Sequence, residues 1–341
     1  MPGPLTDLGV ERPVLAAPMA GGPTTPALVT EAAAAGSLGF LAGGYKTVEA
    51  LAEQVRAVRV VTPRFGVNLF APNPVPVDTD LYAAYALAIR SEGEGYGVDP
   101  TTVPITEDDD HWTEKVELLL AEPVPVVSFT FGIPEAAVVA ALDRAGSLTA
   151  QTVTSPEEAR AAEEAGVRLL VVQASSAGGH SATLTPDWFP DDVLIEDLVR
   201  SVRVATRLPV LAAGGLATVE QVASVLRAGA DAAMVGTVLL RTDESGASAP
   251  HRAALADPAR TSTVLTRAFS GRPARALRNR FVDRYDAIAP AGYPAVHHLT
   301  SPLRRAATAS GDPERVNLWA GTGFRQATDG PVRATLERLT P

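Results

Sequence analysis

The fold of this chain is decided by the stretch Leu169-Leu170-Val171-Val172-Gln173-Ala174-Ser175-Ser176-Ala177-Gly178-Gly179-His180. Its first four residues form an apolar run that predicts a buried strand, and the residues after Gln173 predict a loop. In that loop, glycine lets the backbone approach a ligand closely, and histidine carries a proton that can move near neutral pH. Two interpretations follow: a tight turn with a surface histidine, or a ligand site at the end of a strand.

Apolar runs of this kind alternate with helix signals along the chain. The predicted strands are Val14–Ala17, Leu38–Ala42, Phe65–Leu69, Val126–Phe131, Leu148–Val153, Arg168–Gln173, Pro209–Ala213 and Ala232–Gly236. They are nearly continuous in apolar residues, which is typical of parallel strands covered on both faces. Between them, Thr25-Pro26 predicts a capped helix start, and Ser155 and Thr218 each open a predicted capping box. Eight strands alternating with helices predict an α/β fold, the TIM (β/α)8 barrel.

Two regions interrupt this alternation. Residues 72–110 are rich in proline, glycine and acid, and contain one short predicted helix, Leu81–Ser91. Their acidic run, Glu107-Asp108-Asp109-Asp110, is interpreted as a solvated loop or helix start rather than a metal site. Residues 242–310 are predicted to form a small helical cap over the barrel mouth. The expected organisation is a barrel over 1–241 with an insertion at 72–110, a cap over 242–310, and a C-terminal segment, 311–341, that returns to the barrel.

Composition excludes several classes of function. A chain of 341 residues with 46% hydrophobic residues can bury a large core. A net charge of −10 disfavours nucleic-acid and anionic-membrane partners. The absence of cysteine removes disulfides, thiolate nucleophiles and cysteine-based metal sites. The first residues lack a signal-peptide pattern and no apolar run is long enough to span a bilayer, so a cytoplasmic location is expected.

The residues at the predicted strand ends indicate the chemistry, because barrel enzymes place their active sites there. Those ends read Pro18-Met19-Ala20-Gly21-Gly22, Gly43-Gly44, Asn68-Leu69-Phe70, Thr130-Phe131-Gly132, Gln173 to His180, Gly214-Gly215 and Gly236-Thr237. Acids are absent, which excludes a glycosidase or a carboxylate-bound metal, and no metal site is predicted. The carboxamides of Asn68 and Gln173 can donate and accept hydrogen bonds. They suit the pyrimidine edge of a flavin, or they serve only as satisfied turn amides.

Two glycine loops predict a phosphate site. Gly214-Gly215 follows the seventh predicted strand and Gly236-Thr237 follows the eighth. The loops at these two positions form a recurring phosphate site in such barrels, where backbone amides and a helix N-terminus contact the anion. A purely structural turn is the alternative for each loop alone. The pair favours phosphate.

Read in order, these motifs resemble those of a known family. They are Ala17 to Gly22, Gly66 to Phe70, Val127 to Gly132, Gln173 to His180, Ala213 to Leu216, Val235 to Thr237 and Thr266 to Arg275. The family is the FMN-dependent nitronate monooxygenases, formerly called 2-nitropropane dioxygenases, and flavin enoyl-ACP reductases are close relatives. The resemblance runs from about Pro13 to Gly323.

The resemblance implies a set of site residues. Beside Gly214, the FMN contacts would come from Met19, Asn68, Gln173, Gly178, Gly215, Met234, Val235, Gly236 and Thr237, and His180 matches the catalytic histidine. Two positions depart from the family pattern. Ser176 stands where the family usually has a glutamate. That position is expected to lie near the histidine, so the change is expected to affect which substrate is used. Met234 stands where the family usually has glutamine. Elsewhere, His111 and His251 lie in polar segments, and His297 or His298 could fold over the site from the cap.

The resemblance also implies an activity. An alkyl nitronate such as propionate 3-nitronate, or a nitroalkane, would be oxidised with FMN and O₂, with His180 acting as a base or as a cation that pairs with the nitronate. The alternatives are an NAD(P)H-dependent flavin enoyl reductase or natural-product tailoring flavoenzyme on the same barrel, and a non-redox barrel that binds a phosphate ligand. The expected partners are a small-molecule substrate and O₂. The oligomeric state is left open, with a homodimer as one possibility.

Overall fold

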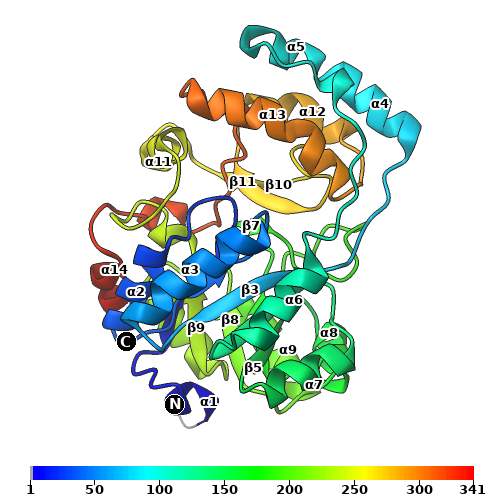
Figure 1. Ribbon diagram of the computed structural model, residues 1–341. Helices are drawn as coiled ribbons and strands as arrows, with labels where there is room; N and C mark the ends of the chain where they lie inside the picture. Colours follow the sequence, from blue (N-terminus) through cyan, green and yellow to red (C-terminus); the bar gives the residue numbers. More distant parts are fainter. Residues whose placement is uncertain (1–2) are drawn as a thin grey trace.

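An eight-stranded parallel barrel forms the body of the molecule (Figure 1). The computed structural model describes residues 3–341. The barrel strands are β1 (Val14–Ala16), β2 (Phe40–Ala42), β3 (Gly66–Ala71), β4 (Val126–Phe131), β5 (Leu148–Val153), β6 (Leu169–Gln173), β8 (Val210–Ala213) and β9 (Ala232–Val235). Their order is β1-β9-β8-β6-β5-β4-β3-β2, and a parallel bridge between Ala16 and Gly39 links the two ends. The predicted (β/α)8 barrel is confirmed.

Helices surround the barrel, and the last of them comes from the C-terminus. The longer helices are α2 (Pro26–Ala34), α3 (Val48–Val61), α6 (Trp112–Ala121), α7 (Ala136–Arg144), α8 (Pro156–Glu164), α9 (Ile195–Ala205), α10 (Val219–Arg227) and α14 (Val332–Leu339), after a short α1 (Pro4–Asp7). Helix α14 packs against α2, so it completes the ring (Figure 1). Over residues 3–341, no helix is both long and apolar enough to cross a membrane.

Helix starts follow the capping signals, with one correction. The Thr25 hydroxyl accepts from the Leu28 amide at 3.1 Å, and Thr218 forms the full predicted capping box with Gln221. At α8, the Ser155 hydroxyl accepts from the Glu158 amide at 3.2 Å, but the reciprocal bond is not made. The Glu158 carboxylate instead accepts from the amides of Thr154 and Leu184. A tertiary contact with the loop after residue 180 replaces the predicted local one.

The cap is built from two distant parts of the chain and contains strands as well as helices. Residues 242–310 hold α11 (Ala249–Ala256), β10 (Thr263–Thr266), β11 (Ala274–Leu277), α12 (Arg280–Tyr285) and α13 (Ala295–Ala309). The insertion supplies α4 (Thr79–Ala88) and α5 (Arg90–Gly93). Side chains of α4, such as Tyr85, pack with Phe269 and Phe281 in one apolar cluster, as the adjacent cyan and orange helices show (Figure 1). The cap thus contains the strand pair β10–β11 in addition to its expected helices, and the domain boundaries stay a prediction.

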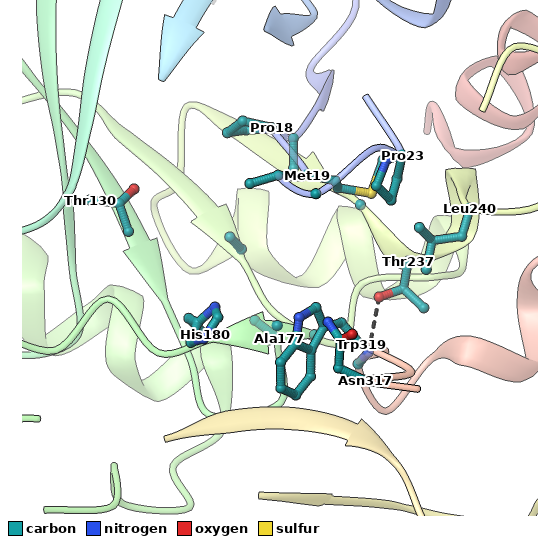
Figure 2. Close-up of a pocket in the computed structure, with 18 of the residues that line it drawn as sticks. Pro18, Met19, Pro23, Thr130, Ala177, His180, Thr237, Leu240, Asn317 and Trp319 are labelled. Atoms are coloured by element: carbon teal, nitrogen blue, oxygen red, sulfur yellow. Dashed lines mark hydrogen bonds between the residues drawn. The ribbon is translucent and has the colours of Figure 1, made fainter. Parts of the chain in front are cut away.

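A two-residue strand connects the barrel mouth to the cap. Strand β7 (Gly179–His180) follows β6 and pairs antiparallel with β11. Ala274 is the partner of His180, and Arg275 is the partner of Gly179. The cap hairpin therefore fixes the backbone of His180 at the edge of the pocket drawn in Figure 2.

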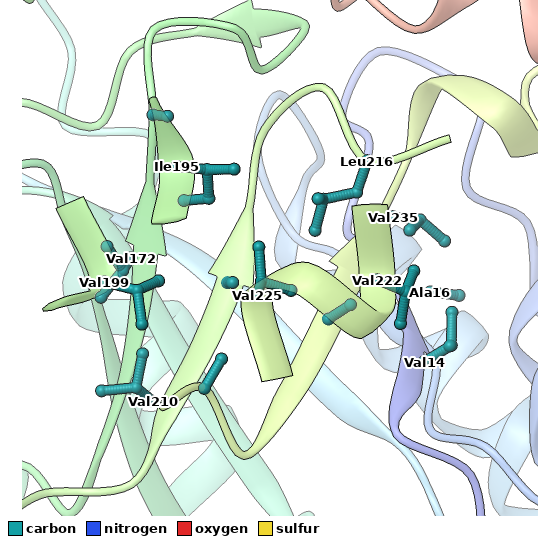
Figure 3. Close-up of a cluster of buried hydrophobic side chains, with 14 of the residues drawn as sticks. Val14, Ala16, Val172, Ile195, Val199, Val210, Leu216, Val222, Val225 and Val235 are labelled. Carbon is teal, nitrogen blue, oxygen red and sulfur yellow. The ribbon is translucent and has the colours of Figure 1, made fainter. Parts of the chain in front are cut away.

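The core lies between the strands and the outer helices. Figure 3 shows Val172 and Val210 on the strands facing Val199 and Val225 on α9 and α10. Leu336 of α14 belongs to the same cluster and is completely buried. Parallel strands covered in this way need apolar residues on both faces, which explains the continuous apolar runs in the sequence.

Candidate active site

A cavity of about 570 Å³ opens at the carboxyl ends of the barrel strands. All of the predicted site residues lie in its wall, although their roles stay predictions. They are Met19, Asn68, Gln173, Gly178, His180, Gly214, Gly215, Met234, Val235, Gly236 and Thr237. Its described lining contains two arginines, Arg304 and Arg305, and neither aspartate nor glutamate. The cavity therefore favours a ligand with negative charge.

One side of the cavity has the close backbone packing expected of a phosphate cradle. Gly215 has a φ of 67°, and a Cβ there would come within 2.7 Å of the Thr322 hydroxyl. A Cβ on Gly178 would come within 2.5 Å of the Gly321 amide nitrogen. The Thr237 hydroxyl accepts from that same amide at 2.9 Å, which is the dashed line in Figure 2. Only glycine fits at these positions, so the residues present are suited to the backbone cradle of a flavin phosphate.

Ser176 lies at this phosphate-like side. A Cβ on Gly214 would be 2.9 Å from the Ser176 hydroxyl, and one on Gly215 would be 3.2 Å from the Ser176 Cβ. The Ser176 side chain therefore packs against the glycine loop, and its effect on the substrate stays a prediction. A carboxylate placed here would lie close to a bound phosphate, so serine suits an anionic ligand better.

The two predicted carboxamides are held differently. The Asn68 Nδ2 group donates to the hydroxyls of Ser128 and Thr130, both at 3.0 Å. Its Oδ1 atom has no hydrogen-bond partner within residues 3–341, so it can accept from a ligand. Gln173 is engaged at both ends, since Oε1 accepts from the Ala182 amide at 2.8 Å and Nε2 donates to the His180 carbonyl at 3.2 Å. Gln173 therefore braces the backbone of the histidine segment, and one of its N–H groups is left for a ligand.

His180 lies in an aromatic enclosure. Its ring centroid is 5.2 Å from that of Trp319, 5.7 Å from Tyr293 and 5.8 Å from Phe131. Figure 2 shows the Trp319 indole between His180 and Thr237. These rings pack around a half-buried imidazole, which also faces the cavity that it lines.

The charges around His180 keep it neutral. Burial, followed by the positive charges of Arg272 and Arg304, lowers the pKa of His180 to about 3. Arg272 is completely buried with its guanidinium 4.1 Å from the Phe131 ring, and its Nη1 atom has no hydrogen-bond partner in the described chain. Among residues 3–341, neither arginine forms an ion pair with a carboxylate. Positive charge at this site therefore comes from arginine, and the imidazole is neutral.

Three lining residues lie away from the strand ends: His251 and Trp319 were not predicted, and His297 was predicted only as a residue that could fold over the site. His251 on α11 was placed in a polar segment, but it is buried, lines the cavity, and its Nε2 group lies 3.0 Å from the Trp319 carbonyl. His297 of α13 does fold over the site and stacks on Tyr45 with ring centroids 4.2 Å apart. Trp319 arrives from the C-terminal segment. None of these residues follows a barrel strand, so inspection of strand ends could not find them.

The remaining acids and histidines lie outside the main cavity. In the acidic run, Asp108 pairs with His298 at 2.8 Å, and Asp110 pairs with Lys115 at 2.7 Å. His111 is exposed. Within residues 3–341, no three His, Cys, Asp or Glu side chains are grouped so that they could hold a metal ion.

Comparison with known proteins identifies the family. Residues 3–341 match the model of the family described as Nitronate monooxygenase. This chain belongs to the nitronate monooxygenase family. A Staphylococcus aureus (strain Newman) protein named "Probable nitronate monooxygenase" is 33% identical over 337 residues, covering 97% of this chain and 94% of that protein.

Two solved structures are similar to this chain over nearly its whole length. The nitroalkane oxidase from Streptomyces ansochromogenes is 47% identical with a TM-score of 0.92, covering 99% of this chain and 96% of that one. FabK from Thermotoga maritima is 25% identical with a TM-score of 0.76, covering 98% and 94%. The protein is thus an oxidoreductase of the nitronate monooxygenase type, a flavin-dependent monooxygenase.

Proposed function

We propose that this protein binds FMN and oxidises alkyl nitronates, including propionate 3-nitronate, and more slowly nitroalkanes, with O₂ as the electron acceptor. The observation that carries the proposal is a neutral His180 beside arginines without carboxylate partners, in a cavity whose described lining contains no acid. Such a site attracts an anionic substrate and stabilises negative charge during the reaction.

FMN is proposed as the cofactor because the cavity has one phosphate-like cradle. Gly214, Gly215, Gly236 and Thr237 would hold its phosphate, and the Asn68 Oδ1 atom would accept from the polar edge of its ring. The sequence has no Gly-x-Gly-x-x-Gly strand–helix fingerprint for a dinucleotide. When bound, the flavin supplies the electron transfer, and the protein supplies position and electrostatics.

The substrate would lie between the cradle and the aromatic enclosure. There, Arg304 at the cavity wall would stabilise the negative charge of the nitronate, and the buried Arg272 would add positive potential from behind Phe131. For a nitroalkane, His180 would first accept the proton from the α-carbon. A base whose pKa is about 3 accepts such a proton inefficiently at neutral pH. A preformed nitronate needs no deprotonation, so we expect nitronates to be the better substrates, giving a carbonyl product and oxidised nitrogen.

Steady-state turnover on both substrate forms tests the proposal. Purified protein should release FMN on heating, as identified by mass spectrometry, and should consume O₂ with propionate 3-nitronate faster than with the corresponding nitroalkane. Release of FAD, or no O₂ consumption with either form, would contradict it.

An NAD(P)H-dependent flavin reductase is the second candidate, favoured by the structural similarity to FabK. Anaerobic mixing separates the two. Rapid bleaching of the flavin by NADH or NADPH would support the reductase, whereas slow bleaching beside rapid nitronate oxidation supports the monooxygenase. The homodimer and the cytoplasmic location stay predictions.

A further inference from the structure

The acidic run at the end of the insertion reaches the cavity through a buried ion pair. Lys115 of α6 is 1% exposed, and its Nζ atom lies 2.7 Å from the Asp110 Oδ2 atom. The same Nζ donates to the Gly43 carbonyl at 3.0 Å, in the loop after β2. The other carboxylate oxygen, Oδ1, accepts from the Tyr45 amide at 2.9 Å. The pair therefore ties the insertion and α6 to the loop that carries Tyr45.

This loop has little freedom to move, and it holds its tyrosine in an uncommon conformation. Tyr45 has a φ of 63°, in the left-handed region that residues other than glycine seldom adopt. A Cβ on the preceding Gly44 would come within 2.3 Å of the Phe70 ring. Such a backbone persists only when its surroundings fix it, and Asp110 supplies the hydrogen bond that does so.

The Tyr45 side chain is fixed on three sides. Its ring stacks on His297 at 4.2 Å with an interplanar angle of 3°, and meets the edge of Phe70 at 5.3 Å. Its hydroxyl accepts from the Tyr293 hydroxyl at 3.3 Å, and the Tyr293 ring contacts that of His180. Tyr45 thus belongs to the His180 end of the cavity, away from the glycine cradle.

Tyr45 also lies between two cavities. It lines the main cavity of about 570 Å³ and a second one of about 150 Å³, whose lining includes Asp108, Asp109 and Asp110. Removing the ring would take away part of the wall between them. We propose that Tyr45 limits the size of the substrate, and that the buried Asp110–Lys115 pair is the positioning device that holds it in place.

The inference rests on the proposed function for its substrate, so its test uses a series of primary nitroalkanes from nitroethane to 1-nitrohexane. The measured quantity is the ratio of kcat/KM for the longest to that for the shortest. Tyr45→Ala should raise this ratio by about tenfold or more, because a pocket wall discriminates chain length on that scale. Asp110→Ala and Lys115→Met should raise it in the same direction through KM, and Asp110→Asn, which keeps an oxygen for the Tyr45 amide, should raise it less.

Glu114→Ala is the matched control, because Glu114 is an exposed neighbour of Lys115 on α6 and lines neither cavity. A ratio in the Tyr45 and Asp110 variants no higher than in this control would overturn the inference. Hydrogen exchange of the segment 43–46 provides a readout that needs no substrate. Asp110→Ala should accelerate exchange there relative to wild type, and unchanged exchange would also overturn the positioning role. A wild type that turns over no nitroalkane or nitronate would refute the proposed function alone, since the exchange experiment would still decide the inference.

Discussion

The Nε2 atom of His180 lies 2.8 Å from the hydroxyl of Ser270. Ser270 belongs to the segment between β10 and β11, so a cap residue holds the side chain of a histidine that follows a barrel strand. The Ser270 hydroxyl also donates to the Arg272 carbonyl at 3.3 Å. The direction of the bond to Nε2 depends on the imidazole tautomer, and in either direction it fixes the orientation of the ring. The cap thus positions the side chain that we propose as the base, in addition to covering the barrel mouth.

Replacing His180 tests its role as a base. His180→Asn should bind FMN normally and should lower nitroalkane turnover by about 10²-fold or more, the usual scale for a lost general base. Anionic nitronates should be affected less, because they need no deprotonation. Steady-state rates on both substrate forms measure this. The exposed His111→Asn serves as the control, and unchanged rates in His180→Asn on both forms would remove the histidine from the mechanism.

Gly215→Val should abolish flavin retention while the barrel stays folded. Its backbone is left-handed and a side chain would intrude on Thr322 and Ser176 at the cradle. The absorbance of the purified protein and its far-UV circular dichroism measure the two properties. Gly146→Val is the matched control, since Gly146 also has a positive φ, 100°, but an open surrounding and no place in the cavity wall. A fully yellow Gly215→Val protein would refute the phosphate assignment.

The buried His251 should make the protein sensitive to acid. Burial lowers its pKa from 6.5 to about 4, with the hydrogen bond to Trp319 acting in the opposite direction. Between these two values the unfolded chain binds a proton that the folded chain excludes, so the free energy of unfolding should fall as the pH falls. One such proton contributes a slope of about 1.4 kcal/mol per pH unit. Urea unfolding from pH 7 to pH 4 should show a shallower slope in His251→Gln than in wild type, and an equal slope would contradict the assignment.

Leu336→Ala should destabilise the barrel by about 3 kcal/mol, the usual cost of a large truncation in a core. Leu336 is completely buried among the strands and helices of the main cluster. Leu194→Ala is the control, because Leu194 is 71% exposed and should change the free energy of unfolding by less than about 0.5 kcal/mol. Equal effects in urea unfolding would mean that α14 does not complete the core.

The sequence predicts the barrel well because its signals are local. The bounds of Val126–Phe131 and Leu148–Val153 agree with the observed strands to the residue, since both are short segments rich in apolar and β-branched residues between turn signals. Strand β7 was not predicted, because two residues carry no periodicity and their partner lies in β11. Similarly, Glu158 has the spacing of a capping box, but a distant backbone amide takes its carboxylate.

The residues of the candidate site also fall into two groups, those that local sequence signals predict and those that only tertiary packing places. Residues at strand ends, such as Asn68 and Gly215, were found because the barrel fold itself says where to look. His251 and Trp319 enter from segments whose path over the mouth depends on tertiary packing. The acidic run shows the same effect. The local sequence predicts that Asp110 is solvated, but in the structure its carboxylate forms an ion pair with the buried Lys115.

The position of α14 has a consequence for how the molecule is made. All eight barrel strands are synthesised by residue 235, yet helix α14, which packs between α10 and α2, is synthesised last, after the whole cap. Until then, the apolar surface around Val14 and Val235 has no partner from α14. During synthesis, the barrel therefore lacks its last covering helix until the C-terminus is made. The cap is synthesised while the outer helical ring is still incomplete.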